Sequence, residues 1–221
     1  MRTLLGLLSL LLLAACTSDS YNQGEGKYSK LVGDYAEMTV NSQKEGVSFT
    51  TDEGATYRLT SPVKAGWMTK ADSIYRTIIY YNKVDNGQAE AVSFALMPTL
   101  RVLQPKEVKR QPEDPVGLES VWMTKNGKYL NLGLLMKNGR LDDGTEGVHA
   151  LALICDKVVT NTDFTKTAYY RLLHDQGEAP TYYSNRKYVS ILLPQVRPDS
   201  VRLTVTTFQG RDERCLSLKI N

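Results

Sequence analysis

Residues 73–97 read SIYRTIIYYNKVDNGQAEAVSFALM, the stretch of the chain that most clearly indicates its fold. The two halves, 73–83 and 89–97, are rich in β-branched and aromatic residues, which favour β-strands. Between them, Asp85-Asn86-Gly87 offers the positive φ angles that a tight hairpin turn needs. We therefore expect two antiparallel strands joined by a short turn.

Shorter strand-like runs lie on both sides of this hairpin. The turn-forming residues Asp52-Glu53-Gly54 separate two of them, and no convincing amphipathic helix interrupts the series. Further strands are expected at 35–40, 47–51, 56–60 and 100–104. Residues 34–105 are thus predicted to form a first β domain.

A change of composition follows this first domain. Residues 105–115 contain three prolines among Lys, Arg, Glu and Asp, with almost no apolar content. Such a segment is typical of a domain boundary, because it offers little apolar surface to a core and proline interrupts regular structure. We predict a linker at 106–116.

A second series of strands fills residues 117–221. Asn126-Gly127 is another hairpin signal, and alternation along the chain places Val201, Leu203 and Val205 on one buried face. Strands are expected at 119–124, 128–137, 148–155, 167–175, 187–194, 200–208 and 214–220. About seven short antiparallel strands in roughly 105 residues are typical of a β-sandwich. The whole mature chain is therefore predicted to be all-β.

The N-terminus has the pattern of a bacterial lipoprotein precursor. A positive start precedes an apolar run at 4–13, which is far shorter than the roughly 20 residues of a membrane-spanning helix. Leu13-Ala14-Ala15-Cys16 closes this run as a lipobox. We expect residues 1–15 to be removed as a signal peptide, lipid on Cys16 to anchor the chain in a membrane, and residues 16–33 to form a flexible tether.

Charge and cysteine content limit the function classes. The formal net charge is +3 and the chain has no basic block, so nucleic acid is not an expected partner. After Cys16, only Cys155 and Cys215 remain. An oxidising envelope would permit a disulfide between them, and the alternative is two separate small buried side chains.

Several short phrases follow one another in a characteristic arrangement. They are the lipobox, the tether, AVSFAL at 91–96 with RVL at 101–103, GKYLNL at 127–132 and DSVRL at 199–203. In this arrangement the chain resembles the NigD-like lipoproteins of Bacteroidetes over nearly the whole mature part. The resemblance implies an OB-like barrel on the N-terminal side and an immunoglobulin-like β-sandwich on the C-terminal side. It carries no catalytic residues, and the family, named after a bacteriocin-associated locus, has an undetermined biochemical role.

A search for catalytic chemistry gives no site. His149 and His174 are more than twenty residues apart and lack a Cys or carboxylate at metal-ligand spacing, so each is interpreted as a strand-end histidine. Asp142 and Asp143 break the calcium-loop template and are interpreted as solvated turn residues, not as calcium ligands or a glycosidase pair. No Gly-x-Ser-x-Gly nucleophile motif is present. We predict no catalytic residue, metal site or cofactor.

Tyrosines are the candidates for a contact surface. On an exported barrel, exposed rings could stack on sugars or dock a peptide, whereas the alternative is cross-strand aromatic pairs that hold the sheet. Side chains alternate along a strand, so one ring of Tyr169-Tyr170 and one of Tyr182-Tyr183 should point outward. The candidates are Tyr75, Tyr80, Tyr81, Tyr169, Tyr170, Tyr182 and Tyr183.

Together these features predict a non-enzymatic binding or assembly protein of the cell envelope, with an envelope protein or glycan as partner. Thr17 follows Cys16 in place of the aspartate that retains enterobacterial lipoproteins at the inner membrane, so the outer membrane is favoured. Asp19 is the single acid in Thr17-Ser18-Asp19-Ser20, whereas related bacteria export lipoproteins to the surface with an acidic run, so the periplasm-facing leaflet is expected. The alternatives are an immunity-like protein that intercepts a secreted peptide toxin, motivated by the family name, and an envelope glycan or peptide hydrolase.

Overall fold

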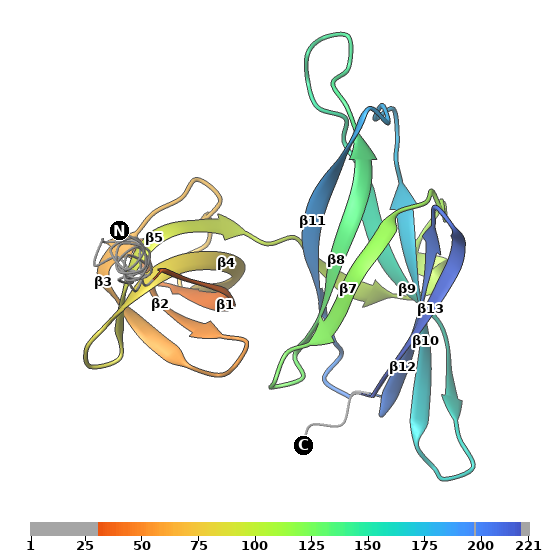
Figure 1. Ribbon diagram of the computed structural model, residues 1–221. Helices are drawn as coiled ribbons and strands as arrows, with labels where there is room; N and C mark the ends of the chain where they lie inside the picture. Colours follow the sequence, from red (N-terminus) through yellow and green to blue (C-terminus); the bar gives the residue numbers. More distant parts are fainter. Residues whose placement is uncertain (1–30, 197, 218–221) are drawn as a thin grey trace, which may run out of the picture.

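A computed structural model of the chain describes residues 31–196 and 198–217 (Figure 1). Within these residues the regular structure consists of strands and one short 3₁₀ helix at Pro105–Glu107, so the all-β prediction is confirmed. None of the described residues belongs to a helix long and apolar enough to cross a bilayer. The signal peptide, Cys16 and the predicted tether up to residue 30 lie outside the described residues, whereas residues 31–33, also predicted as tether, already belong to the first strand.

The N-terminal strands form a closed barrel with the order β1-β2-β3-β5-β4. Its strands are β1 (Leu31–Val40), β2 (Gly46–Thr51), β3 (Thr56–Val63), β4 (Ser73–Val84) and β5 (Gln88–Leu96). The β4–β5 turn places Asn86 and Gly87 at φ 61° and 69°, as the hairpin prediction requires. Buried Phe49 and Tyr81 meet edge to face in the barrel core, with ring centroids 4.8 Å apart. The predicted OB-like barrel is therefore confirmed.

The remaining strands form one eight-stranded sheet with the order β13-β12-β10-β9-β6-β11-β8-β7. They are β6 (Thr99–Leu103), β7 (Gly117–Met123), β8 (Tyr129–Asn138), β9 (Ala150–Thr160), β10 (Lys166–Asp175), β11 (Tyr183–Leu192), β12 (Ser200–Thr207) and β13 (Gly210–Ser217). The sheet curls so that its two halves face each other across a single core, as the layers of the expected sandwich do (Figure 1). Val201, Leu203 and Val205 are buried in this core, as their alternation predicted.

Strand β6 differs from the prediction, because the run at 100–104 was expected to close the first domain. It pairs in parallel with β9 and β11 instead, and so joins the two halves of the curled sheet. Leu100 and Val102 pack against the core of that sheet. The barrel needs no further strand, because β1 already closes it by pairing with β4.

The predicted linker is hydrogen-bonded to the curled sheet, and Val116 at its end is buried in the core of that sheet. The His174 amide donates to the Pro112 carbonyl at 3.1 Å, and the Asp114 amide donates to the His174 carbonyl at 3.0 Å. Further on, the Val116 amide donates to the Thr206 carbonyl at 3.0 Å. This proline-rich segment is therefore fixed to β10 and β12 by backbone hydrogen bonds.

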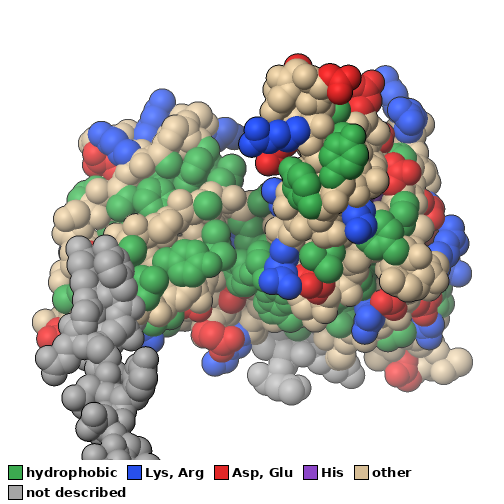
Figure 2. Space-filling model, turned by 45° about the horizontal axis from the view of Figure 1, so that its top comes forward, with side chains coloured by type: hydrophobic (Ala, Val, Ile, Leu, Met, Phe, Trp, Pro, Cys, Tyr) green, Lys and Arg blue, Asp and Glu red, His purple; other side chains and the backbone are tan. Residues whose placement is uncertain are grey.

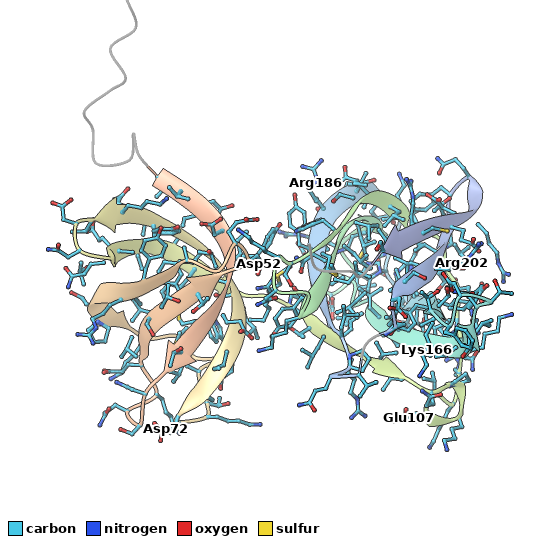
Figure 3. All side chains as sticks on the ribbon, turned by 90° about the horizontal axis from the view of Figure 1, so that it is seen from below. Asp52, Asp72, Glu107, Lys166, Arg186 and Arg202 are labelled. Carbon is cyan, nitrogen blue, oxygen red and sulfur yellow. The ribbon has the colours of Figure 1, made fainter. Side chains whose placement is uncertain are left out.

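A buried ion pair of the barrel is hydrogen-bonded to the curled sheet. Arg76 of β4 donates to both carboxylate oxygens of Asp52 at 2.5 and 2.6 Å, and Asp52 lies at the junction of the two bodies in Figure 3. The same guanidinium donates to Ser190 Oγ at 2.9 Å and lies 4.4 Å from the centroid of the Tyr129 ring. The Asn131 amide adds a bond to Asp52 at 3.1 Å. The bonds of Arg76 and Asp52 to Ser190 of β11 and Asn131 of β8 therefore fix how the barrel sits on the sheet.

Candidate functional site

The candidate tyrosines do not form one surface. Tyr81 and Tyr170 are buried in the barrel core and the sheet core respectively. Tyr75 packs against Trp67 with ring centroids 5.4 Å apart, and its hydroxyl accepts a bond from the Lys70 amide at 2.9 Å. These three rings therefore hold sheets together, as the alternative interpretation had it.

The outward-facing tyrosines occupy separate places. Tyr80 lies on the barrel against Gly33, while Tyr169 is covered by Lys157, whose Nζ is 4.6 Å from the ring centroid. Buried Tyr170 and outward-facing Tyr169 follow the predicted alternation. The same prediction is wrong for Tyr182-Tyr183, because Tyr182 precedes β11 in a bend and both rings are exposed.

Tyr182 belongs to a surface that we call the loop pole, formed by the β8–β9 loop (139–149) and the β10–β11 loop (176–182). The two loops project from the same end of the curled sheet (Figure 1). Within the first, the Leu141 amide donates to the Thr145 carbonyl at 2.8 Å and the Gly147 amide donates to the Gly139 carbonyl at 3.0 Å. Asp143 Oδ1 accepts bonds from the Thr145 amide and hydroxyl at 2.8 and 2.6 Å, as expected for a turn residue.

Two glycines allow the loops of the loop pole to touch. A Cβ added to Gly147 would lie 2.4 Å from the Cα of Ala179, and one added to Gly139 would lie 2.7 Å from the Tyr182 ring. Contacts this short are sterically forbidden, so only glycine permits the approach. The loops therefore support each other, and Tyr182 leans on Gly139.

The loop pole presents large apolar side chains to solvent. Val148 is 82% exposed and Tyr182 is 81% exposed. Both lie on loops whose backbones are in close contact, and the Gly147 amide before Val148 is hydrogen-bonded. Figure 2, in which the top of Figure 1 comes forward, shows hydrophobic side chains among acidic and basic ones at this end of the sheet. An apolar centre with a charged rim is typical of protein contact sites.

A histidine pair forms the base of the loop pole. His149 Nδ1 lies 2.8 Å from His174 Nε2, and the rings stack with an interplanar angle of 16°. His174 Nδ1 lies 3.0 Å from the Asp114 carbonyl, which can only accept a hydrogen bond. The hydrogen-bond network therefore assigns the Nδ1 proton to each ring, with His174 Nε2 accepting from His149.

This assignment leaves His149 Nε2 as a buried acceptor with no partner among the described residues. Burial, then the neighbouring His174 and Lys187, lowers the pKa of His149 below its ordinary value. Asp114 also accepts a bond from the Gln176 amide at 2.8 Å, so the linker, the histidine pair and the second loop form one unit. Protonation of His149 Nε2 would place an extra buried N–H in this unit.

The pairing of the histidines was missed in the sequence. The signal that could have found it is the antiparallel register of β9 and β10, because His174 pairs with Leu151 and so lies diagonally across from His149, two residues before Leu151. No group of three or more His, Cys, Asp or Glu side chains that could hold a metal ion occurs in residues 31–196 and 198–217.

The two cysteines of the described chain are both free. Cys155 is buried on β9 and Cys215 is exposed on β13, with β12 and β10 lying between these strands in the sheet. The disulfide weighed from the sequence is therefore absent, and the alternative holds for Cys155, which packs in the core.

Comparison with known proteins shows what the fold is similar to. No family model and no curated protein matches the chain. A NigD-like immunity protein from Bacteroides caccae ATCC 43185 is 17% identical, with a TM-score of 0.61 over 84% of this chain and 92% of that one. A protein named as a candidate toxin-related protein from Parabacteroides distasonis ATCC 8503 is 14% identical, with a TM-score of 0.65 over 86% of this chain and 94% of that one.

A third solved structure is named as a candidate lipoprotein, from Bacteroides fragilis NCTC 9343. It is 14% identical, with a TM-score of 0.61 over 86% of this chain and 98% of that one. At such identities the similarity establishes a shared fold. The resemblance noted in the sequence is thus confirmed at the level of fold: the described chain folds like a NigD-like immunity protein and lipoprotein-like proteins of Bacteroidetes.

Proposed function

We propose that the chain is a non-enzymatic binding protein of the cell envelope that contacts a partner protein through the loop pole. The observation that carries this proposal is the exposure of Val148 and Tyr182, 82% and 81%, on loops locked together by glycine contacts. A ring held on a rigid support loses little conformational freedom on binding, so its buried area contributes effectively to affinity. Aromatic side chains of this kind are frequent energetic centres of protein interfaces.

The proposal places the protein on the outer membrane, anchored through lipid on Cys16 with the folded part in the periplasm. The lipobox before Cys16 and the absence of an aspartate at position 17 support this placement. The shared fold with a candidate lipoprotein from Bacteroides fragilis is consistent with an envelope location.

Interception of a secreted peptide toxin is a second candidate. The shared fold with a NigD-like immunity protein favours it, and the loop pole would then bind the toxin. Deletion of the gene should sensitise the producing cells to a toxin encoded nearby. Unchanged sensitivity would leave the general binding role and remove this specific one.

The test compares two exposed aromatic residues at opposite ends of the curled sheet. Tyr182 is 81% exposed on the loop pole, and Phe164 is 88% exposed in the β9–β10 loop at the far end. Partners are captured by crosslinking intact cells and identified by mass spectrometry for wild type, Tyr182→Ala and Phe164→Ala. A hot-spot side chain contributes about 2 kcal/mol or more, so Tyr182→Ala should reduce capture by roughly tenfold or more. Equal capture by the two variants, or no partner in wild type, would overturn the proposal.

A further inference from the structure

The curled sheet is open on one side. β7 and β13 are its terminal strands, and within residues 31–196 and 198–217 each pairs with one strand, β8 and β12 respectively. Both terminal strands nevertheless line a single groove of about 380 Å³, formed by residues 118–121 of β7 and 214–216 of β13. Figure 1 shows β7 and β13 on the same side of the curled sheet. Two strand edges therefore border one gap.

The inner side of this groove is apolar. Leu118 and Val121 lie opposite Leu134 and Leu132 in the register of β7 and β8, so they share the core-facing side of the sheet. Leu216 likewise lies opposite buried Val201. Leu118, Val121 and Leu216 are partly buried and pack against the sheet core, which leaves apolar surface for an occupant to cover.

The β13 wall of the groove offers backbone hydrogen-bonding groups. The two-residue turn after β12 makes Thr207 and Gly210 a hydrogen-bonded pair. Because such pairs alternate along an antiparallel ladder, Arg214 and Leu216 bond to β12, whereas the N–H and C=O of Glu213 and Cys215 point away from it. An extended peptide carries alternating N–H and C=O groups on both of its edges, and so matches a gap between two strand edges.

Charged side chains beside the groove form ion pairs with neighbouring charged residues. Glu119 accepts two bonds from Arg186 of β11 at 2.5 and 2.9 Å, and Arg214 donates to Asp212 on its own strand at 2.8 Å. Charges on edge strands discourage pairing between identical edges. The groove thus combines an apolar interior with charged borders, which suits a strand with apolar residues on one face and polar residues on the other.

We propose that this groove binds an extended segment of a partner protein by β-strand addition. The segment would pair with β7 and β13 and convert the eight-stranded open sheet into a closed barrel. A strand rises about 3.3 Å per residue, so the groove accommodates roughly three or four residues of the partner segment. Alternate side chains would cover Leu118, Val121 and Leu216. The site is separate from the loop pole and does not depend on it.

The test uses a photocrosslinking residue in the full chain in its own cells. Azidophenylalanine replaces Arg214, which lines the groove, or Arg202, which lies on β12 outside it (Figure 3). Arg202 is a matched control for Arg214, because the side chains are 45% and 52% exposed and each bonds an acidic residue. We expect a light-dependent adduct with another protein at position 214, at least tenfold stronger than at position 202. Equal labelling, or no adduct, would overturn the proposal.

A second pair of variants tests the backbone contact. Cys215→Pro removes an N–H that points into the groove and spares the β12–β13 bonds, whereas Cys215→Ala keeps that N–H. In the presence of azidophenylalanine at 214, Cys215→Pro should reduce the adduct at least tenfold and Cys215→Ala should not, with circular dichroism confirming both folds. If Cys215→Pro fails to fold, the comparison of positions 214 and 202 still decides whether a partner binds in the groove. A retained adduct in folded Cys215→Pro, or an adduct formed by two copies of this chain, would overturn the proposal. Tyr182→Ala should leave the adduct unchanged, which separates this site from the loop pole.

Discussion

Removal of Asp52 should destabilise the protein strongly, because it leaves Arg76 as an unpaired buried charge. The Arg76 side chain is 3% exposed and that of Asp52 is 17% exposed. Breaking a buried ion pair from one side typically costs about 3–5 kcal/mol. Arg76 keeps its bonds to Ser190 and Asn131, so we expect Asp52→Ala to lie near the lower end, about 3 kcal/mol. At about 2–4 °C per kcal/mol for a chain of this size, the melting temperature should fall by roughly 6–12 °C.

Urea unfolding followed by tryptophan fluorescence measures this effect. Trp122 reports on the junction, because its ring lies 5.5 Å from that of Tyr35. The double variant Asp52→Leu/Arg76→Met should recover most of the loss, since replacing both members of a buried pair with apolar residues is often close to neutral. Glu213→Ala, which breaks the exposed pair with Arg202, is the control and should cost less than about 1 kcal/mol. Additive losses in the double variant, or a loss below about 1 kcal/mol for Asp52→Ala, would refute the role of the ion pair.

Three further predictions concern the loop pole and the anchor. Gly147→Ala should destabilise the chain by about 1–3 kcal/mol in urea unfolding because its Cβ meets Ala179, whereas Gly66→Ala, where a Cβ meets nothing within 4 Å, should be neutral or slightly stabilising. The pKa of His149 is lowered in the folded chain, first by burial, so the unfolded chain takes up its proton at a higher pH. The contribution of His149 to stability is therefore fully present above the ordinary histidine pKa and is lost as the pH falls below it. The melting temperature should therefore be lower at pH 5 than at pH 7.5, and an equal difference in His149→Gln would contradict this origin. Cys16→Ala should move the protein from the membrane fraction to the soluble fraction, and unchanged sedimentation with membranes would refute lipid anchoring.

Local sequence patterns predicted the strands well, because period-two alternation and turn residues act over a few neighbouring positions. The hairpin at Asn86-Gly87 and the buried face of Val201, Leu203 and Val205 are cases of this kind. Strand β6 was assigned to the wrong group because its parallel partners, β9 and β11, are distant in sequence. Nothing in a short apolar run specifies which core it will join.

The candidate site was harder to predict for the same physical reason. The contacts that define it join distant residues, such as Gly147 with Ala179 and His149 with His174. Tyr182 was identified as a candidate from its residue type, but its exposure follows from its place in a bend before β11 and not from strand alternation. The buried position of Arg76 is a further case, because the groups that surround it, Asp52 and Ser190, are distant from it in sequence.

The most direct test of the central claim is the affinity of the purified protein for its captured partner, measured by isothermal titration calorimetry. The account predicts that Tyr182→Ala raises Kd at least tenfold, equivalent to about 1.4 kcal/mol, while Phe164→Ala leaves Kd unchanged. Equal Kd values for wild type and Tyr182→Ala would contradict a binding role for the loop pole.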